Sequence, residues 1–136
     1  MTDPRWEALC DKLARGGYST LRPAEKVWIN IRELIDSVEN GGVISYFYNP
    51  GADTLRDCID ALTQLGADDI RAQLDRVCAL FGDGVPASLE ARNGVIDSWK
   101  DDGDVDSLLE AVDRDLMPML PALEAKLDAF VRSSCG

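Results

Sequence analysis

The stretch from residue 40 to residue 67 restricts the fold more than any other part of the chain, because it places two helix ends around one helix start. Apolar residues three and four positions apart precede it, which predicts an amphipathic helix. These residues are Val27, Trp28, Ile31, Leu34, Ile35 and Val38. Asn40, Gly41 and Gly42 then predict the end of this helix, since glycine adopts the left-handed conformation of many helix ends without strain.

A run of three aromatic residues follows this helix end. Tyr46, Phe47 and Tyr48 would point to different sides of a short helical turn, so at least one is expected to pack beneath the preceding helix. Asn49 is predicted either to accept a hydrogen bond from the first free N–H groups of the next segment or to turn the chain before Pro50. The alternative interpretation is that these aromatic rings line a groove for a partner or a ligand.

A second helix start and a second helix end complete the stretch. Gly51 fits a turn, Asp53 or Thr54 is expected to cap a helix, and Gly66 is expected to end that helix. The apolar residues between them keep helical spacing: Leu55, Cys58, Ile59, Leu62 and Leu65. We interpret one set of residues as structural, fixing how two helices meet: Asn40, Gly41, Gly42, Tyr46, Phe47, Asn49, Gly51 and Gly66.

Helical spacing recurs through the rest of the chain, and no strand pattern accompanies it. Asp3 is expected to open the first helix ahead of a proline, and Asp68 or Asp69 to cap a later one. Ser107 and Glu110 match the capping box Ser-x-x-Glu. A length of 136 residues fits one domain. We therefore predict a single all-α domain over residues 1–136, with about seven or eight helices.

The chain has no histidine and four cysteines, which narrows its chemistry. Without histidine it lacks the commonest general base and the commonest transition-metal ligand. Cys10, Cys58 and Cys78 fall on apolar helical positions and are expected to be buried thiols, whereas Cys135 is expected to be exposed. We predict no catalytic residue, no metal site and no cofactor, and do not expect an enzyme. A pair of carboxylates converging in a pocket is the remaining catalytic alternative.

The net charge is −11, from 25 acidic and 14 basic residues. Direct binding to nucleic acid or to an anionic membrane surface is not expected, because both need basic patches. No apolar run is long enough to span a membrane, and the first residues lack a signal-peptide pattern, so a cytoplasmic location is expected. A basic protein is the partner that this charge favours.

The acidic residues are densest in one segment near the end of the chain: Asp97, Asp101, Asp102, Asp104, Asp106, Glu110, Asp113 and Asp115. A calcium loop of the EF-hand type does not fit, because aligning Gly103 with its glycine puts Leu109 where the motif needs a glutamate. One interpretation is a solvated face with acid-rich helix starts, which the helix dipole stabilises. The other is a binding surface for a basic partner.

The extreme form of such a surface imitates DNA, and charge density limits that imitation. A chain of this length folds to a diameter of roughly 35–40 Å. Duplex DNA carries about 20 charges over that span, whereas the net charge here is −11. One molecule could therefore imitate one face or one strand of a duplex, and a dimer that joins two acidic faces could imitate more.

Residues 40–67 resemble the signature of a small all-helical bacterial family whose characterised member is a neisserial DNA-mimic protein. The resemblance rests on Asn40-Gly41-Gly42, Tyr46-Phe47, Asn49, Gly51 and Leu65-Gly66-Ala67. It covers about 30 residues well, and the last third of the chain only weakly. The motif is therefore informative for the fold, while the acidic segment is not part of the resemblance.

The resemblance implies a bacterial protein, dimeric, that offers an acidic surface to a basic DNA-binding protein such as a transcriptional regulator. The carboxylates would occupy the sites where arginine and lysine meet phosphates. The alternative function is an immunity or antitoxin-like protein that inhibits a basic toxin enzyme, which the same acidity would serve. The sequence leaves both open, and neither depends on the structural motif touching the partner.

Overall fold

The computed structural model describes residues 3–135, and every regular element in that range is a helix. The α-helices are α1 Pro4–Gly16, α2 Pro23–Gly41, α3 Val43–Phe47, α4 Leu55–Gln64, α5 Asp68–Cys78, α6 Leu89–Asp97, α7 Gly103–Leu116 and α8 Leu120–Ser134. Short 3-10 turns join them: η1 Tyr18–Thr20, η2 Pro50–Thr54, η3 Ala79–Phe81 and η4 Met117–Met119. The predicted all-α class and the expected number of helices are confirmed.

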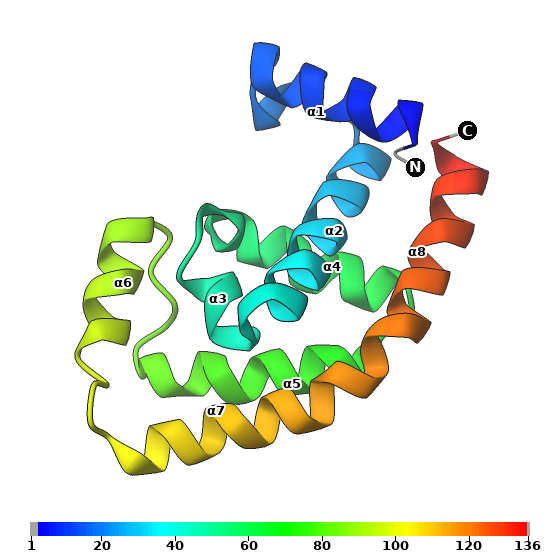
Figure 1. Ribbon diagram of the computed structural model, residues 1–136. Coiled ribbons are helices and arrows are strands. Elements are labelled where there is room, and N and C mark those ends of the chain that lie inside the picture. Colours follow the sequence, from blue (N-terminus) through cyan, green and yellow to red (C-terminus); the bar gives the residue numbers. More distant parts are fainter. Residues whose placement is uncertain (1–2, 136) are drawn as a thin grey trace.

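Helix α2 runs through the middle of the molecule and packs against α3, α4 and α8 (Figure 1). Its apolar stripe supplies much of the core, and Ile31, Leu34 and Ile35 have no exposed surface. Helices α5 and α7 lie side by side below it in Figure 1, and α8 rises along its other side. The core is therefore built around the helix that the sequence pattern predicts most clearly.

Several predicted helix ends are confirmed by their hydrogen bonds and backbone angles. The Asp3 side chain accepts a hydrogen bond from the backbone N–H of Arg5 and caps α1. Gly42 follows the last residue of α2 with a φ of 80°, in the left-handed region where glycine is favoured. Gly66 ends α4 with a φ of 72°. The residues that open and close helices at these points act as the sequence predicts.

The predicted capping box at Ser107 and Glu110 is wrong, because both residues lie inside α7. The helix begins one turn earlier, at Gly103. The Asp102 side chain caps it by accepting hydrogen bonds from the backbone N–H groups of Asp104 and Val105, at 3.0 and 3.2 Å. An aspartate at the N-cap is as favourable as a serine, so the earlier start adds a turn of helix at no loss of capping.

Two other predicted caps do not form. Residue Ala67 holds the N-cap position of α5, so Asp68 and Asp69 lie in its first turn. Thr54 holds the N-cap position of α4, but its hydroxyl donates to the Asn30 side chain at 2.6 Å instead of capping the helix. Thr54 forms a tertiary hydrogen bond instead of a cap. Asp68 and Asp69 lie in the first turn of α5, where the helix dipole stabilises their negative charge.

The cysteines are free, and only one of them is fully buried. Cys58 has no exposed surface, whereas Cys10, Cys78 and Cys135 are half-buried. The prediction is therefore right for Cys58, wrong for the full burial of Cys10 and Cys78, and wrong for the exposure of Cys135. Burial raises the pKa of Cys58 to about 12 and that of Cys78 to about 11, so both are protonated thiols at neutral pH.

Candidate interaction surface

The acidic segment, residues 97–115, covers the end of α6, the loop after it and the length of α7. Successive residues of an α-helix are turned by about 100° around its axis. Asp106, Glu110 and Asp113, at intervals of four and three, therefore share one edge of α7. Asp104 and Asp115 lie toward the opposite edge. The acidic residues of α7 thus form two separate edges and not one continuous face.

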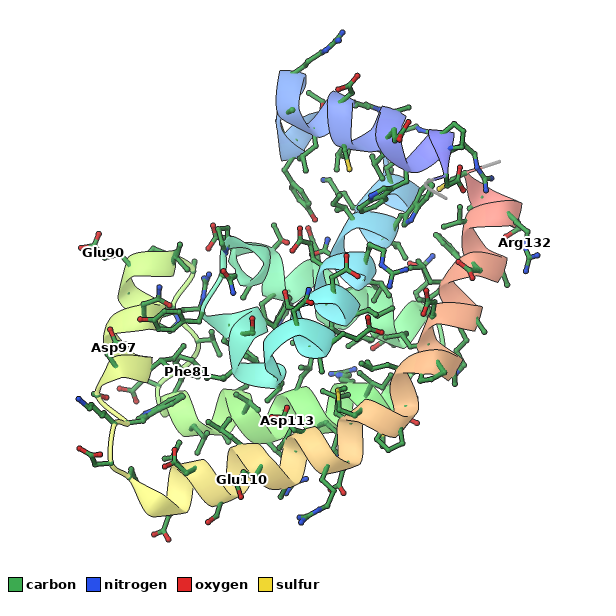
Figure 2. The ribbon with its side chains drawn as sticks, in the orientation of Figure 1. Phe81, Glu90, Asp97, Glu110, Asp113 and Arg132 are labelled. Atoms are coloured by element: carbon green, nitrogen blue, oxygen red, sulfur yellow. The ribbon has the colours of Figure 1, made fainter. Side chains whose placement is uncertain are left out.

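Asp113 is turned toward α3 and is half-buried (Figure 2). Its Oδ1 atom accepts a hydrogen bond of 2.7 Å from the backbone N–H of Val43, the first residue of α3. A Cβ atom on Gly42 would lie 2.6 Å from Asp113 Oδ2, which is closer than atoms can approach. Gly42 therefore both ends α2 and makes room for this carboxylate. The structural motif and the acidic segment meet at this contact.

Three more of the predicted acidic residues have partners within the molecule. Asp115 forms an ion pair with Arg76 of α5, with 3.2 Å between Oδ2 and Nη1. Asp102 caps α7. Asp97 accepts a hydrogen bond of 2.8 Å from the Tyr48 hydroxyl, and this bond is the main cause that raises the pKa of Tyr48. Asp115 and Asp97 thus join their helices to other elements, and Asp102 stabilises the start of its own helix.

The remaining four acidic residues, Asp101, Asp104, Asp106 and Glu110, are exposed. Within residues 3–135, none of them forms an ion pair. Figure 2 shows Glu110 on the outer side of α7, away from the core, and Glu90 and Asp97 on the outer side of α6. Unpaired exposed carboxylates keep their full charge available to a second molecule.

Arg92 of α6 is the structural residue that the sequence pattern hides, because it occupies an apolar position of its helix between Leu89 and Ile96. It is fully buried. Its guanidinium group donates five hydrogen bonds: Nε to the Phe47 carbonyl, Nη1 to the Pro86 and Ala87 carbonyls, and Nη2 to the Asn49 carbonyl and Asp53 Oδ1. All five N–H groups of the side chain are used. An arginine within an apolar stripe was the signal available in the sequence.

The bonds of Arg92 join α6 to the aromatic corner, which we define as residues 40–54. Tyr46 and Phe47 are fully buried there, and Tyr48 is 41% exposed. The ring of Phe47 lies 5.8 Å from that of Phe81, which lies 5.0 Å from the ring of Trp99. Two of the three aromatic residues are thus buried on α3, a helix that packs against α2, which agrees with the prediction that at least one of them packs beneath that helix.

Of the two roles predicted for Asn49, its side chain does not accept a hydrogen bond from the next segment, but the chain does bend at this residue before Pro50. Its side-chain nitrogen donates to the backbone carbonyl of Ser45 at 2.5 Å, and its own carbonyl accepts from Arg92 at 3.0 Å. The side chain therefore closes the turn of α3 behind it, while the backbone anchors α6. Gly41 is the last residue of α2, and Asn40 beside it is exposed.

A metal-binding cluster and a membrane-spanning helix are both absent from the described part of the chain. Among residues 3–135, no three acidic or cysteine side chains are placed to hold a metal ion together. None of the helices in this range combines the length and the apolar character that crossing a membrane requires.

Fold and surface together define a small acidic all-helical protein with a buried structural corner and with unpaired carboxylates on α7 and in the loop before it. A family model described as "DMP19-like protein" matches residues 19–134, and the chain belongs to this family. This agrees with the resemblance seen in residues 40–67. No curated protein and no solved structure matches the chain. The family match spans the acidic segment as well as the corner, and so extends further along the chain than the motif does.

Proposed function

We propose that this protein is a non-catalytic binding protein that offers acidic side chains to a basic DNA-binding protein, such as a transcriptional regulator, and keeps it from DNA. One observation carries the proposal: Asp101, Asp104, Asp106 and Glu110 are exposed and have no cationic partner among residues 3–135. Membership of the DMP19-like family supports it. The other predicted acidic residues have partners of their own and contribute mainly through their charge.

The mechanism is competition for arginine and lysine side chains that would otherwise contact phosphates. The net charge of −11 attracts a basic partner over a distance and speeds its association. Salt screens this attraction, with a Debye length of about 8 Å at physiological ionic strength. Binding should therefore weaken steeply as salt is added, as protein–DNA binding does.

The geometry of α7 sets how closely the surface can imitate a DNA strand. Asp106 and Glu110 are four residues apart, so they are displaced by about 6 Å along the helix axis. A DNA strand carries one charge for about every 3.4 Å of its axis. This edge of α7 has roughly half the linear charge density of one strand. A homodimer that places two such edges together would come closer to that density.

The test is affinity capture from native lysate at low and at high salt, with two matched variants. In the first variant, Asp104→Asn, Asp106→Asn and Glu110→Gln remove three of the unpaired charges. In the control, Glu39→Gln, Asp60→Asn and Asp128→Asn remove three exposed charges elsewhere, so that net charge changes equally. The proposal expects a basic protein that the wild type and the control retain at low salt and that the first variant loses.

The identity of the captured protein then distinguishes the proposed function from the immunity function. Wild-type protein should displace a captured regulator from its DNA, and the first variant should do so much less well. If the captured protein is instead a toxin enzyme whose activity is inhibited, the immunity function replaces this proposal. Equal capture by both variants would contradict the assignment of the surface to α7.

A further inference from the structure

A cavity of about 270 Å³ opens between the end of α1, the middle of α2 and η2. Its walls are largely apolar and include Leu13, Ile29 and Pro50. One wall of the cavity belongs to the aromatic corner, because η2 lines the cavity and also supplies the Asp53 side chain that binds Arg92. The volume is below the range of roughly 300–1,000 Å³ that is usual for drug-sized ligands. It is suited to a single side chain.

The charged residues that line this cavity are both acidic. They are Glu33 and Asp53, and no lysine or arginine lines it. Asp53 is already paired with Arg92, whereas Glu33 has no ion-pair partner within residues 3–135. A Cβ atom on Gly51 would lie 3.1 Å from Glu33 Oε2, so the Glu33 carboxylate is in close contact with this glycine. Burial, and next the charge of Asp36, raise the pKa of Glu33.

The hydrogen-bond donors of the neighbouring side chains are already in use. Asn30 donates to the Tyr18 hydroxyl and to the Lys26 carbonyl, both at 2.8 Å, and Thr54 donates to Asn30. Tyr18 donates to Asp57 at 2.5 Å, and burial, with this bond, raises the pKa of Tyr18 to about 12. These side chains leave no donor for an anion. An open carboxylate beside apolar walls suits a cation on an apolar stem.

We propose that this cavity receives an arginine side chain of the basic partner, with the guanidinium group on Glu33 and the methylene stem against Leu13, Ile29 and Pro50. The inference rests on the proposed function, because it requires a basic protein partner. Arginine suits the site because its planar group pairs with a carboxylate through two parallel hydrogen bonds. Buried arginine anchors of this kind often dominate the energy of an interface. The Tyr18 ring already has a cation beside it, because Lys26 lies 5.1 Å from its centre. Glu33, and not this ring, therefore recognises the positive charge of the incoming arginine.

The first experiment titrates the intact protein with Nα-acetyl-arginine N-methylamide while NMR follows backbone and Glu side-chain signals. The matched probe is the corresponding citrulline compound, which has nearly the same shape and no charge. We expect saturable shifts of residues that line the cavity and a lower pKa of Glu33 when the arginine compound is bound. Binding of the citrulline compound should be weaker by about tenfold or more, since hydrogen bonds between charged groups are the stronger kind.

Two variants test the site from different sides. Glu33→Gln removes the carboxylate charge, and Gly51→Ala keeps the charge but places a methyl group 3.1 Å from Glu33 Oε2, so that the carboxylate must shift. Glu33→Gln and Gly51→Ala should each weaken binding of the arginine compound by about fivefold to tenfold. Glu39→Gln, on the same helix and exposed outside the cavity, should leave it unchanged. Equal binding of the two probes, or shifts that spread over α7 without saturation, would overturn the proposal.

Capture from lysate separates this inference from the proposed function. If Glu33→Gln weakens capture of the basic protein while Glu39→Gln does not, the cavity is part of the interface. If the α7 variant loses the partner and Glu33→Gln retains it fully, the proposed function stands and the cavity is not its anchor. If the arginine compound binds but no basic protein is captured, the proposed function fails and the assignment to a protein partner fails with it.

Discussion

The aromatic corner and α7 use their polar groups in opposite ways. In the corner, the carbonyls of Phe47 and Asn49 accept hydrogen bonds from one buried guanidinium group, and the Asn49 side chain bonds within its own turn. On α7, the exposed side chains of Asp106 and Glu110 form no ion pair within residues 3–135. Asp113 belongs to both regions, because it stands on α7 and caps α3.

This contrast separates what defines the fold from what is available for binding. Most of the residues that carry the family resemblance are buried, end a helix or form internal hydrogen bonds, so a change at these positions should reduce stability first. The unpaired residues of α7 contribute little to stability and keep their charge for a partner. Substitutions that reduce stability and substitutions that reduce partner binding should therefore fall on different residues.

The largest effect is expected for Arg92→Met. Methionine fills much of the same space but removes all five donors, and leaves four backbone carbonyls and Asp53 without their partner. We expect the free energy of unfolding to fall by about 3–5 kcal/mol. Urea unfolding followed by circular dichroism measures this loss. Arg114→Met is the control, because Arg114 is exposed on α7, and it should change stability by less than about 0.5 kcal/mol.

Gly42→Ala should have the next largest effect. The backbone φ of 80° is unfavourable for alanine, and the new Cβ atom would collide with the Asp113 carboxylate. We expect a loss of about 1–3 kcal/mol. The double variant Gly42→Ala with Asp113→Ala relieves the collision and keeps the backbone strain. Its loss of stability should therefore be smaller than the sum of the two single losses, and strict additivity would show that the two residues do not interact.

Asp113→Ala and Asp106→Ala compare two aspartates on one edge of α7. Asp113 caps α3, so its loss should cost about 0.5–2 kcal/mol, as the loss of a helix cap does. Asp106 is exposed and unpaired, and its loss should stay within about 0.5 kcal/mol. Thermal and urea unfolding of both variants provide the measurement. Equal losses would remove the distinction between the two regions.

The smallest effect on stability is expected for Tyr48→Phe. This change removes only an exposed hydrogen bond of 2.8 Å to Asp97 and leaves the ring in place. We expect a change in the free energy of unfolding within about 0.5 kcal/mol. The pKa of Tyr48 is raised in the folded protein, chiefly by this bond. The bond is therefore present below the pKa of an unfolded tyrosine and lost as pH rises through the folded pKa. Any stability difference between variant and wild type should disappear at high pH.

The helical class and most helix ends could be predicted from the sequence because they depend on neighbours in the chain. The α2 stripe, Gly42 and Gly66 are examples, since periodicity and backbone preference act locally. The role of Asp113 could not be predicted, because its partner Val43 lies 70 residues away. The five bonds of Arg92 likewise reach segments up to 45 residues distant. A dense run of acidic residues shows charge, but not which carboxylates are paired.

One consequence of Arg92 concerns local motion. Arg92 is fully buried, whereas the apolar residues Leu89, Val95 and Ile96 of α6 are only partly buried. Opening of α6 alone would break these hydrogen bonds but leave the core around α2 intact. Such a unit opens at a fraction of the cost of unfolding the whole domain. Helix α6 carries Glu90 and Asp97 on its outer side (Figure 2). Helix α6, and Glu90 with it, is thus held against the aromatic corner largely by the hydrogen bonds of a single buried side chain.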